Sequence, residues 1–329
     1  MESLINIAEK KILVTGGAGF LGKEVVQELR KNGVSQDNII IPRSAEYDLR
    51  NQEQAFELIK THKPQIVIHL AARLGGIGDN MAHPAAYFYD NIMLGINIIE
   101  ACRKNGIEKL VNIGTVCSYP KIVPAPFKEE DLWNGYPEET NAPYGVSKKA
   151  VMVYSEAVYR EYGFKTVNLL VTNLYGPGDD FREQTSHVIP AIIKKMDEAK
   201  RNNRKEIIAW GDGSPSRDFV YVGDAANGIV RAAAFHNTPE PINIGAGEEY
   251  TIKQLMEILK EETGFGGEIV WDASRPNGQP RRLLDISRAR SALGFNPQMS
   301  FREGLKLTYN WYLDNYSQIL AITPKFAGE

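Results

Sequence analysis

Tyr144 and Lys148 form a pair of side chains that could transfer protons. They stand four positions apart directly after Pro143, a residue that favours a helix start. Side chains four positions apart on a helix share one face, so the phenol and the ammonium would be neighbours. A free phenol titrates near pH ~10, and a nearby cation lowers its pKa. We expect this pair to exchange a proton with a substrate hydroxyl, the alternative being an exposed pair on a solvated helix face.

A glycine-rich loop follows the apolar run Lys11–Thr15. Its glycines allow a tight turn, close approach of the backbone to a pyrophosphate, and close packing of the next helix on the strand. The N-terminus of that helix would attract the pyrophosphate through its free N–H groups and its dipole. The loop therefore predicts a nicotinamide dinucleotide site, the alternative being a simple strand-to-helix turn. The expected contacts are Gly16, Gly19, Phe20, Leu21 and Gly22.

The residues after the second apolar run bear on the choice between NAD and NADP. An acidic residue commonly binds the ribose hydroxyls of NAD at this place. This chain has Arg43 and Ser44 there, which would suit the 2′-phosphate of NADP, whereas Asp37 comes too early. We expect NADP(H), with NAD(H) as the alternative, and Arg43 could instead be a solvated surface residue. Further cofactor contacts are expected from Asp48, Leu49, Ala71 and Lys148.

Apolar runs alternate with amphipathic stretches in the first half of the chain. Such alternation predicts right-handed crossovers and a parallel sheet, and runs that are apolar throughout indicate helices on both faces. Ligands bind at the carboxyl ends of such strands, where Thr115 could hydrogen-bond the same substrate oxygen as Tyr144. The expected strands are 11–15, 38–41, 65–70, 109–113 and 166–171, and the expected helices are 21–31, 52–61, 91–105 and 144–162.

Turn-rich segments break this pattern after Asn173. We therefore predict an α/β fold, with a Rossmann-type doubly wound parallel sheet and a smaller mixed α/β C-terminal substrate domain. Segments 219–234 and 242–245 are expected to return to the main sheet. The predicted nucleotide-binding domain is 1–174 with about 219–245, and the predicted substrate domain is 175–218 with 246–329.

Composition excludes several other classes of protein. The 329 residues are 43% hydrophobic and 24% charged, which is enough for a substantial core in one large or two medium domains. A net charge of −3 does not favour nucleic acid, and no apolar run reaches the roughly 20 residues of a membrane span. Cys102 and Cys117 cannot form a disulfide framework, and we see no signal peptide or metal-ligating motif. A cytoplasmic protein is expected.

The glycine loop and the Tyr144–Lys148 pair resemble the extended short-chain dehydrogenase/reductase superfamily. Longer motifs make the chain similar to the GDP-L-fucose synthase family, from about Ile12 to about Trp311. These motifs are Ala71-Ala72-Arg73-Leu74-Gly75-Gly76-Ile77, Cys117-Ser118-Tyr119-Pro120, Thr140-Asn141-Ala142-Pro143-Tyr144, Asn173-Leu174-Tyr175-Gly176-Pro177, Ser186-His187-Val188-Ile189-Pro190-Ala191 and Pro280-Arg281-Arg282-Leu283-Leu284-Asp285.

The resemblance implies a double epimerisation followed by a reduction. That family inverts C3 and C5 of GDP-4-keto-6-deoxy-D-mannose and then reduces the C4 ketone with NADPH. By resemblance Cys117 is the base and His187 the acid, two groups that titrate near neutrality. Tyr144 and Thr115 would stabilise the enolate oxygen, and Tyr144 would later protonate the C4 oxygen. Alternatively, Cys117 is a small buried hydrophobe and His187 caps a helix.

The resemblance also implies which residues bind the GDP-sugar and how the chain assembles. Arg217 suits a diphosphate by bidentate pairing, while Trp210 could equally lie in the core and Lys195 could be simply solvated. Pairing of helices 91–105 and 144–162 across a homodimer is implied, and the second helix carries surplus apolar residues. The implied substrate contacts are Asn173, Val188, Lys195, Trp210, Arg217 and Asn277.

The chain departs from the family pattern at three positions. Ala18 stands where an arginine is common in the glycine loop, which leaves NADP preference resting on Arg43 and Ser44. Asn277 replaces a common aspartate, and Val116 replaces a small hydroxyl residue. These changes leave open a 4-reductase or a 3,5-epimerase acting on a related GDP-keto-sugar. A catalytically inactive cofactor-sensing module is the remaining alternative, although such modules typically lose the tyrosine–lysine pair.

Overall fold

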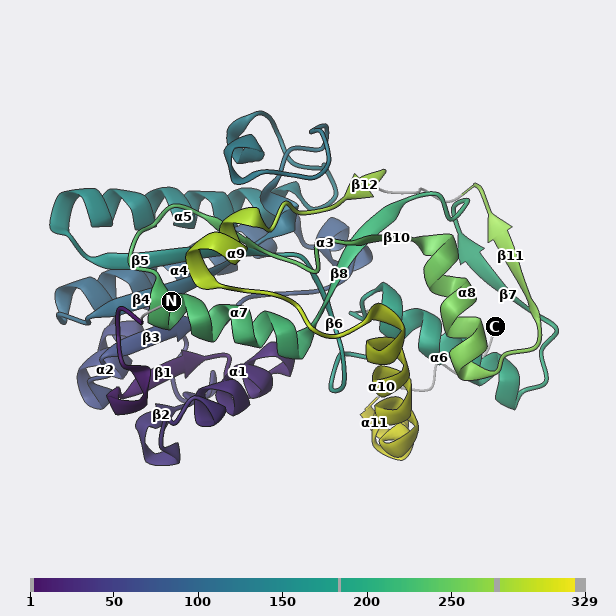
Figure 1. Cartoon of the computed structure of the whole chain (residues 1–329), viewed down its shortest axis with the longest axis horizontal. Helices are drawn as coiled ribbons and strands as arrows, with labels where there is room; N and C mark the ends of the chain where they lie inside the picture. Colours follow the sequence, from purple (N-terminus) through teal and green to yellow (C-terminus); the bar gives the residue numbers. More distant parts are fainter. Residues whose placement is uncertain (1–2, 183–184, 275–278, 323–329) are drawn as a thin grey trace.

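The computed structural model describes residues 3–182, 185–274 and 279–322. Within these residues, six strands form one parallel sheet, which lies between two layers of helices (Figure 1). In sheet order the strands are β2 (Ile39–Ile40), β1 (Ile12–Thr15), β3 (Ile66–His69), β4 (Lys109–Thr115), β5 (Lys165–Val171) and β9 (Ile242–Ile244).

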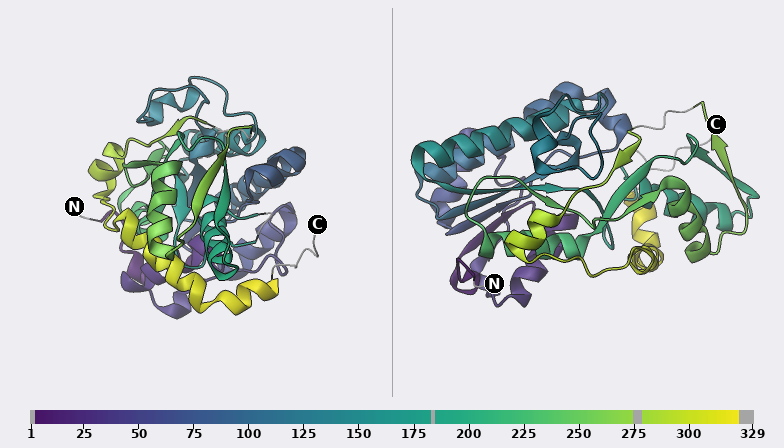
Figure 2. Two further views of the ribbon diagram at one scale, coloured as in Figure 1. Left: turned by 90° about the vertical axis from the view of Figure 1, so that its right-hand side faces the viewer. Right: turned by 45° about the horizontal axis from the view of Figure 1, so that its top comes forward.

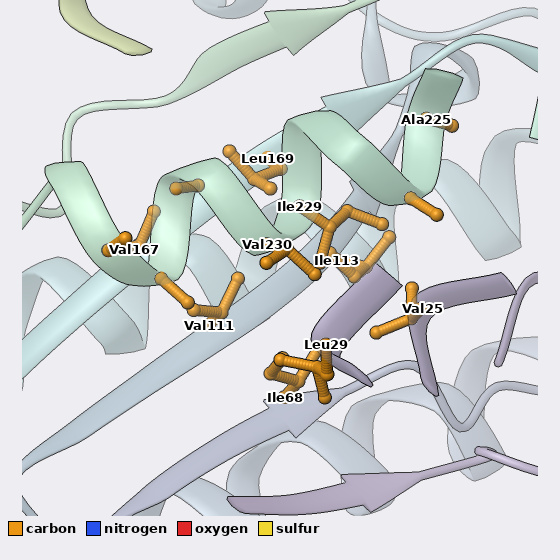
Figure 3. Close-up of a cluster of buried hydrophobic side chains, with 14 of the residues drawn as sticks. Val25, Leu29, Ile68, Val111, Ile113, Val167, Leu169, Ala225, Ile229 and Val230 are labelled. Atoms are coloured by element: carbon orange, nitrogen blue, oxygen red, sulfur yellow. The ribbon is translucent and has the colours of Figure 1, made fainter. Parts of the chain in front are cut away.

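Alternating side chains of these strands build a separate core on each face of the sheet. Ile12 and Val14 face a cluster with Val25 and Ile229, whereas Leu13 between them faces the opposite cluster. Figure 3 shows the first of these clusters, with side chains from two helices lying over the strands. Helices α1 (Phe20–Lys31) and α7 (Val222–Phe235) cover that face, and α2 (Gln52–His62), α4 (Pro84–Lys104) and α5 (Ala142–Tyr162) cover the other.

The order of the strands reverses between β1 and β3. The chain runs outward from β1 to β2 and then returns to place β3 on the other side of β1. Connections on the two sides therefore leave the sheet in opposite directions, which opens a crevice at the carboxyl ends of these strands. The glycine loop after β1 and Ala71 after β3 lie at this point of the fold.

Three helices and two small sheets form the second part of the molecule, on the right of Figure 1. The helices share a buried cluster that includes Ile193, Leu259 and Leu305. They are α6 (Val188–Arg201), α8 (Ile252–Thr263) and α10 (Phe301–Asp314). One sheet joins β10 (Glu249–Thr251), β8 (Ser216–Tyr221) and β12 (Arg281–Arg282), with β6 (Asn173–Tyr175) also on β8; the other pairs β7 (Glu206–Trp210) with β11 (Glu268–Asp272).

Short helices complete the described structure. Figure 2 shows α9 beside the main sheet and the C-terminal helix α11 next to α10. The short elements are η1 (Ile7–Glu9), η2 (Gln36–Asn38), α3 (Ile77–Ala82), η3 (Val116–Ser118), η4 (Glu129–Trp133), α9 (Ser287–Leu293) and α11 (Tyr316–Ile322). No helix in the described ranges has the length and apolar character needed to cross a membrane.

The predicted α/β class and parallel Rossmann-type sheet are confirmed, with corrections to single elements. Helix α4 begins at Pro84 instead of residue 91, because the proline occupies its first turn. Segment 219–234 does not enter the main sheet. Its first residues extend β8, which pairs with β6, β10 and β12, and the remainder forms α7, which packs on the sheet as a helix. Ile242–Ile244 does join the main sheet, as β9.

Candidate active site

The glycine loop has the geometry that the sequence predicts for a close approach of backbone. Gly16 adopts a φ of +70°, which favours glycine, and an added Cβ would crowd the backbone of Ala71. A Cβ on Gly22 would overlap the carbonyl oxygen of Gly16, so only glycine lets α1 begin this close to β1. Gly19 is the N-cap residue of α1 and has no side chain that could occupy the first N–H groups. The loop therefore leaves a helix N-terminus ready for an anion.

The other residues expected at the cofactor lie around the same crevice. Arg43 and Ser44 are exposed just after β2. Asp48 accepts hydrogen bonds from Arg50, whose guanidinium lowers the pKa of that carboxyl. Leu49 is buried in the core, and its carbonyl accepts a hydrogen bond from Asn97 Nδ2 at 3.0 Å, so neither its side chain nor its carbonyl is free for a cofactor contact.

A buried hydrogen-bond chain that the sequence did not reveal links the ends of β1 and β3. Thr15 Oγ1 lies 2.8 Å from His69 Nδ1 and accepts a hydrogen bond from the Ala71 N–H at 3.2 Å. Burial, with a smaller contribution from the charge of Lys148, lowers the pKa of His69 to about 3. This histidine is therefore neutral, and it fixes the floor of the crevice where a dinucleotide would lie.

Thr115, Cys117 and Tyr144 come together at the carboxyl end of β4. Thr115 ends β4, and its Oγ1 accepts a hydrogen bond from the N–H of Cys117 at 3.2 Å. A hydrogen bond with the same threonine favours the ionised form of Tyr144, in the first turn of α5. The structure thus brings the predicted base and the predicted phenol to one threonine.

Gly145 allows helix α5 to approach the turn η3 closely. A Cβ on Gly145, next to Tyr144 in α5, would overlap the carbonyl oxygen of Cys117. Ser118 Oγ also donates a hydrogen bond to the Gly145 carbonyl at 3.0 Å. Helix α5 and the turn η3 are therefore in direct backbone contact, and this contact sets the distance between the thiol and the phenol.

The ionisation of Tyr144 differs from the sequence expectation. Burial raises the pKa of Tyr144, and the charge of Cys117 raises it further. Lys148 does not oppose the rise in the pKa of Tyr144. Its Nζ donates a hydrogen bond to the Ile113 carbonyl at 3.1 Å, and burial lowers the pKa of Lys148 itself to about 8. The expected lowering of the phenol pKa by the lysine is wrong for the chain alone, where Tyr144 is a neutral phenol.

Cys117 has a cationic neighbour that the sequence analysis did not single out. Arg282 Nη1 lies 3.6 Å from Cys117 Sγ, and Arg282 is only 8% exposed. Its Nε donates to Gln279 Oε1 at 2.7 Å. Cys117 is half-buried, so it is not the inert core hydrophobe of the alternative interpretation. The alternation of side chains along the strand in the motif at 280–285 could have indicated that Arg282 points inward. It could not have indicated that Cys117 is its neighbour.

His187 lies beside a buried carboxylate. It is the N-cap residue of α6, but its side chain makes no capping hydrogen bond. Its Nδ1 lies 3.5 Å from Asp179 Oδ1, and this contact raises the pKa of His187 despite the opposing effect of burial. No hydrogen bond or ion pair between His187 and Cys117 is present in the described part of the chain. The two side chains come from separate elements, η3 and the start of α6.

Two of the expected substrate residues stand on the β6–β8 pair. Arg217 Nη1 donates to the carbonyls of Ser216 and Gln279, both at 2.7 Å. Burial lowers the pKa of Arg217 to about 9, with a further contribution from the charge of Arg282. Asn173 donates to the Asp218 carbonyl at 2.9 Å, so its amide is partly engaged by the protein.

The remaining expected substrate residues lie on α6 and β7. Trp210 is 63% exposed, so it is not a core residue. Lys195 Nζ donates to the Ile208 carbonyl at 2.8 Å, and Val188 is exposed at the start of α6. Asn277 falls outside the described residues. Within the described ranges, no group of three or more His, Cys, Asp or Glu side chains is placed to hold a metal ion.

Tyr87 is a further side chain that sequence reasoning missed. Its ring lies edge-on to that of Tyr144, with 6.4 Å between centroids. Its hydroxyl donates to Asp79 Oδ2 at 2.5 Å, and a Cβ on Gly75 would overlap that hydroxyl. This aromatic wall from α4 limits the positions open to the Tyr144 ring.

Comparison with known proteins identifies the family. The model of the NAD-dependent epimerase/dehydratase family matches residues 12–245. The chain belongs to this family. GDP-L-fucose synthase 1 of Arabidopsis thaliana is 38% identical over 305 residues, which cover 93% of this chain and 94% of that protein.

Solved structures of two nucleotide-sugar enzymes are similar to this chain over most of its length. A GDP-L-fucose synthetase from Naegleria fowleri bound to NADP matches with a TM-score of 0.83 at 28% identity, covering 93% of this chain and 94% of that one. A GDP-6-OMe-4-keto-L-xylo-heptose reductase from C. jejuni matches with a TM-score of 0.86 at 29% identity, covering 94% and 99%. The predicted resemblance and the predicted class of nucleotide-sugar enzyme are confirmed.

Proposed function

We propose that this chain carries out the GDP-L-fucose synthase reaction. It inverts C3 and C5 of GDP-4-keto-6-deoxy-D-mannose and then reduces the C4 ketone with NADPH. The observation that carries the proposal is the convergence of Cys117 and Tyr144 on Thr115 at the carboxyl end of β4. Thr115 Oγ1 bonds the backbone N–H of Cys117 and the phenol of Tyr144, so a thiol and a phenol stand at the end of one strand, as suits a ketone that is first enolised and later reduced. The 38% identity to the Arabidopsis GDP-L-fucose synthase supports the same substrate.

NADP(H) is the cofactor in this proposal, as in the Naegleria fowleri relative bound to NADP. The residues present fit a dinucleotide, because Gly16 and Gly22 leave a cradle that a Cβ would fill. The first turn of α1 would hold the pyrophosphate, Arg43 and Ser44 the 2′-phosphate, and Lys148 the nicotinamide ribose. When bound, NADPH supplies the hydride that reduces the ketone carbon.

The substrate would lie between the two parts of the molecule. Arg217 would pair with the diphosphate, and Trp210 would pack on the base, helped by Lys195. Val188, Asn173 and Asn277 complete the proposed contacts. Residues 1–174 with about 219–245 would then bind the cofactor, and 175–218 with 246–329 the sugar nucleotide.

Epimerisation needs a base and an acid on opposite faces of the sugar. Cys117 Sγ takes the proton from the carbon next to the ketone, and the electron pair of that C–H bond moves to the carbonyl oxygen. Thr115 and Tyr144 hydrogen-bond the resulting enolate oxygen. His187 then returns a proton to the carbon from the other face. The side chain of His187 is 47% exposed, so it can recover its proton from water.

Reduction needs a proton donor at the C4 oxygen. Burial keeps Tyr144 protonated at neutral pH. As the hydride reaches C4, the phenol can give its proton to the developing alkoxide, and the ammonium of Lys148 lies one helical turn along the same face. Tyr144 therefore acts as an acid in the direction of ketone reduction.

The test is conversion of GDP-4-keto-6-deoxy-D-mannose with NADPH in deuterated water. We expect one NADPH to be oxidised per product, with deuterium at C3 and C5. Cys117→Ser should lower deuterium incorporation by about 10²–10⁴-fold, and Tyr144→Phe should lower NADPH oxidation by a similar factor. Failure of the wild-type protein to oxidise NADPH, or full incorporation in Cys117→Ser, would contradict the proposal.

A 4-reductase acting on a related GDP-keto-sugar is the second candidate. The likeness to the C. jejuni heptose reductase favours it. NADPH oxidation without deuterium at C3 and C5 would select this candidate. An inactive cofactor-sensing module fits less well, because Thr115, Cys117, Tyr144 and Lys148 are all present.

We further propose a homodimer formed through α4 and α5. These helices contact each other on one face of the sheet, and their outer sides expose Tyr89 and Val153. A cytoplasmic location is part of the proposal, because a base that must stay a free thiol favours a reducing compartment.

A further inference from the structure

Two arginines face the same thiol from neighbouring strands. β12 pairs with β8 in parallel, and this pairing sets Arg282 opposite Arg217. Arg282 is 8% exposed, whereas the side chain of its neighbour Arg281 is 52% exposed and pairs with Glu249. Strand alternation therefore sends one arginine inward and the other to the surface.

The inward pair has only neutral acceptors among its hydrogen-bond partners. Arg282 donates to Gln279 Oε1, and Arg217 donates to the carbonyls of Ser216 and Gln279. Among the residues that the structure describes, neither guanidinium has a carboxylate within ion-pair distance. A buried cation beside a half-buried one is unfavourable unless an anion compensates them.

Cys117 is the ionisable group placed to compensate them. Its Sγ lies 3.6 Å from Arg282 Nη1, and the charge of Cys117 favours the charged form of Arg217. The charge of Glu138 favours the charged Arg217 as well, but Glu138 is not within ion-pair distance of either arginine, and among the described residues the Tyr144 phenol is the other titratable group that acts on the thiol. Ionic attraction within this distance selectively stabilises a thiolate over a thiol.

We propose that Arg282 is a positioning residue that holds Cys117 as a thiolate ready to accept a proton. The source of the accepted proton, the sugar, rests on the proposed function. The preference of Cys117 for its charged form does not rest on it. In the proton transfer the substrate C–H bond breaks, the proton goes to Sγ, and the electron pair goes to the enolate oxygen. The guanidinium loses its anionic partner as the enolate gains the charge, so charge is redistributed within one small site.

The test measures the rate at which iodoacetamide alkylates Cys117 as a function of pH, in the full-length protein without substrate. Cys117→Ser supplies the background from Cys102, which is fully buried. Arg282→Gln should move the rise in rate to higher pH and slow alkylation about tenfold at neutral pH. Arg282→Lys keeps the cation and should stay within about threefold of wild type. An unchanged profile in Arg282→Gln would overturn the proposal.

Two control variants separate charge from structure. Arg281→Gln removes the same charge at the adjacent exposed position and should leave the profile unchanged. Gln279→Ala removes the neutral partner of Arg282 but keeps its cation, so its shift should be much smaller than that of Arg282→Gln. An equal shift in either control would show that a general charge or structural effect, and not the Arg282 guanidinium, governs the thiol.

A second measurement needs no variant at Arg282, in case that substitution prevents folding. Two guanidinium groups beside one thiolate leave a net positive charge that should attract an anionic reagent, so the ratio of iodoacetate to iodoacetamide rates at Cys117 should exceed that of free cysteine. A ratio no higher than that of free cysteine would overturn the proposal. Because no substrate is used, the thiolate result stands apart from turnover, and failure of the wild-type protein to convert the sugar would reject the proposed function alone.

Discussion

At the scale of single residues, Cys117 and His187 each have a charged side chain as a neighbour. Arg282 lies next to the thiol, and the carboxylate of Asp179 lies next to the imidazole. Asp179 raises the pKa of His187, so the imidazolium persists to higher pH than it would in water. This assignment of charges suits a cysteine that takes protons and a histidine that gives them.

Asp179→Asn should move the alkaline limit of epimerisation to lower pH. His187 must be protonated to act as an acid, so its rate is full below its pKa and falls as pH rises through that value. Loss of the carboxylate removes the main cause of the raised pKa, so the alkaline limit should lie at lower pH than in the wild type. The measurement is kcat/KM for deuterium incorporation against pH.

Asp180→Asn is the matched control for that experiment. Asp180 acts on His187 only through space, because its carboxylate bonds to Arg182 and Thr185. Asp180→Asn should therefore displace the alkaline limit of epimerisation by less than Asp179→Asn does. An alkaline limit that stays in place in Asp179→Asn would refute His187 as the acid.

At the scale of elements, the site depends on how closely α5 approaches the turn after β4. The backbone contact at Gly145 fixes Tyr144, in the helix, relative to Cys117, in η3. Most residues that carry the chemistry come from separate elements, so small displacements of these elements affect the reaction directly.

Gly145→Ala should reduce both activity and stability. The added methyl group would overlap the Cys117 carbonyl and push α5 away from η3. We expect a loss of about 1–3 kcal/mol in the free energy of unfolding and a fall in kcat of about 10²-fold. Denaturant unfolding and steady-state kinetics measure the two effects.

Gly266→Ala is the control, because a Cβ at Gly266 would meet no heavy atom within 4 Å. It should leave both quantities near their wild-type values. Wild-type kcat in Gly145→Ala would show that the spacing of α5 and η3 is not critical.

At the scale of the whole molecule, the outer surface of α4 and α5 is the proposed dimer interface. Val153 is 48% exposed in the middle of α5, on the far side of the helix from the sheet. Figure 2 shows α4 and α5 lying together along one side of the main sheet. A second copy of the chain would bury this surface.

Val153→Glu should convert the dimer to a monomer, since a buried carboxylate without a partner costs several kcal/mol. Light scattering after size-exclusion chromatography measures the mass. Leu307→Glu, at an exposed position of α10, should leave the mass unchanged. A wild-type mass of a monomer, or a dimer retained in Val153→Glu, would reject this interface.

The sequence by itself determined the fold class and the elements with strong local signals. Apolar strands, Gly22 and Pro143 act over a few residues, so the parallel sheet, the glycine loop and the start of α5 could be predicted. Longer motifs carried the family and brought forward Cys117 and His187, whose roles remain predictions.

The tertiary structure decided what depends on neighbours distant in the chain. Arg282 reaches Cys117 across 165 positions, and Tyr87 meets Tyr144 from another helix. The Tyr144 phenol stays neutral because burial and the charge of Cys117 outweigh its hydrogen bond with Thr115, which spacing along a helix could not reveal. Charge and burial at a site are sums over residues that folding brings together, so only the folded chain sets them.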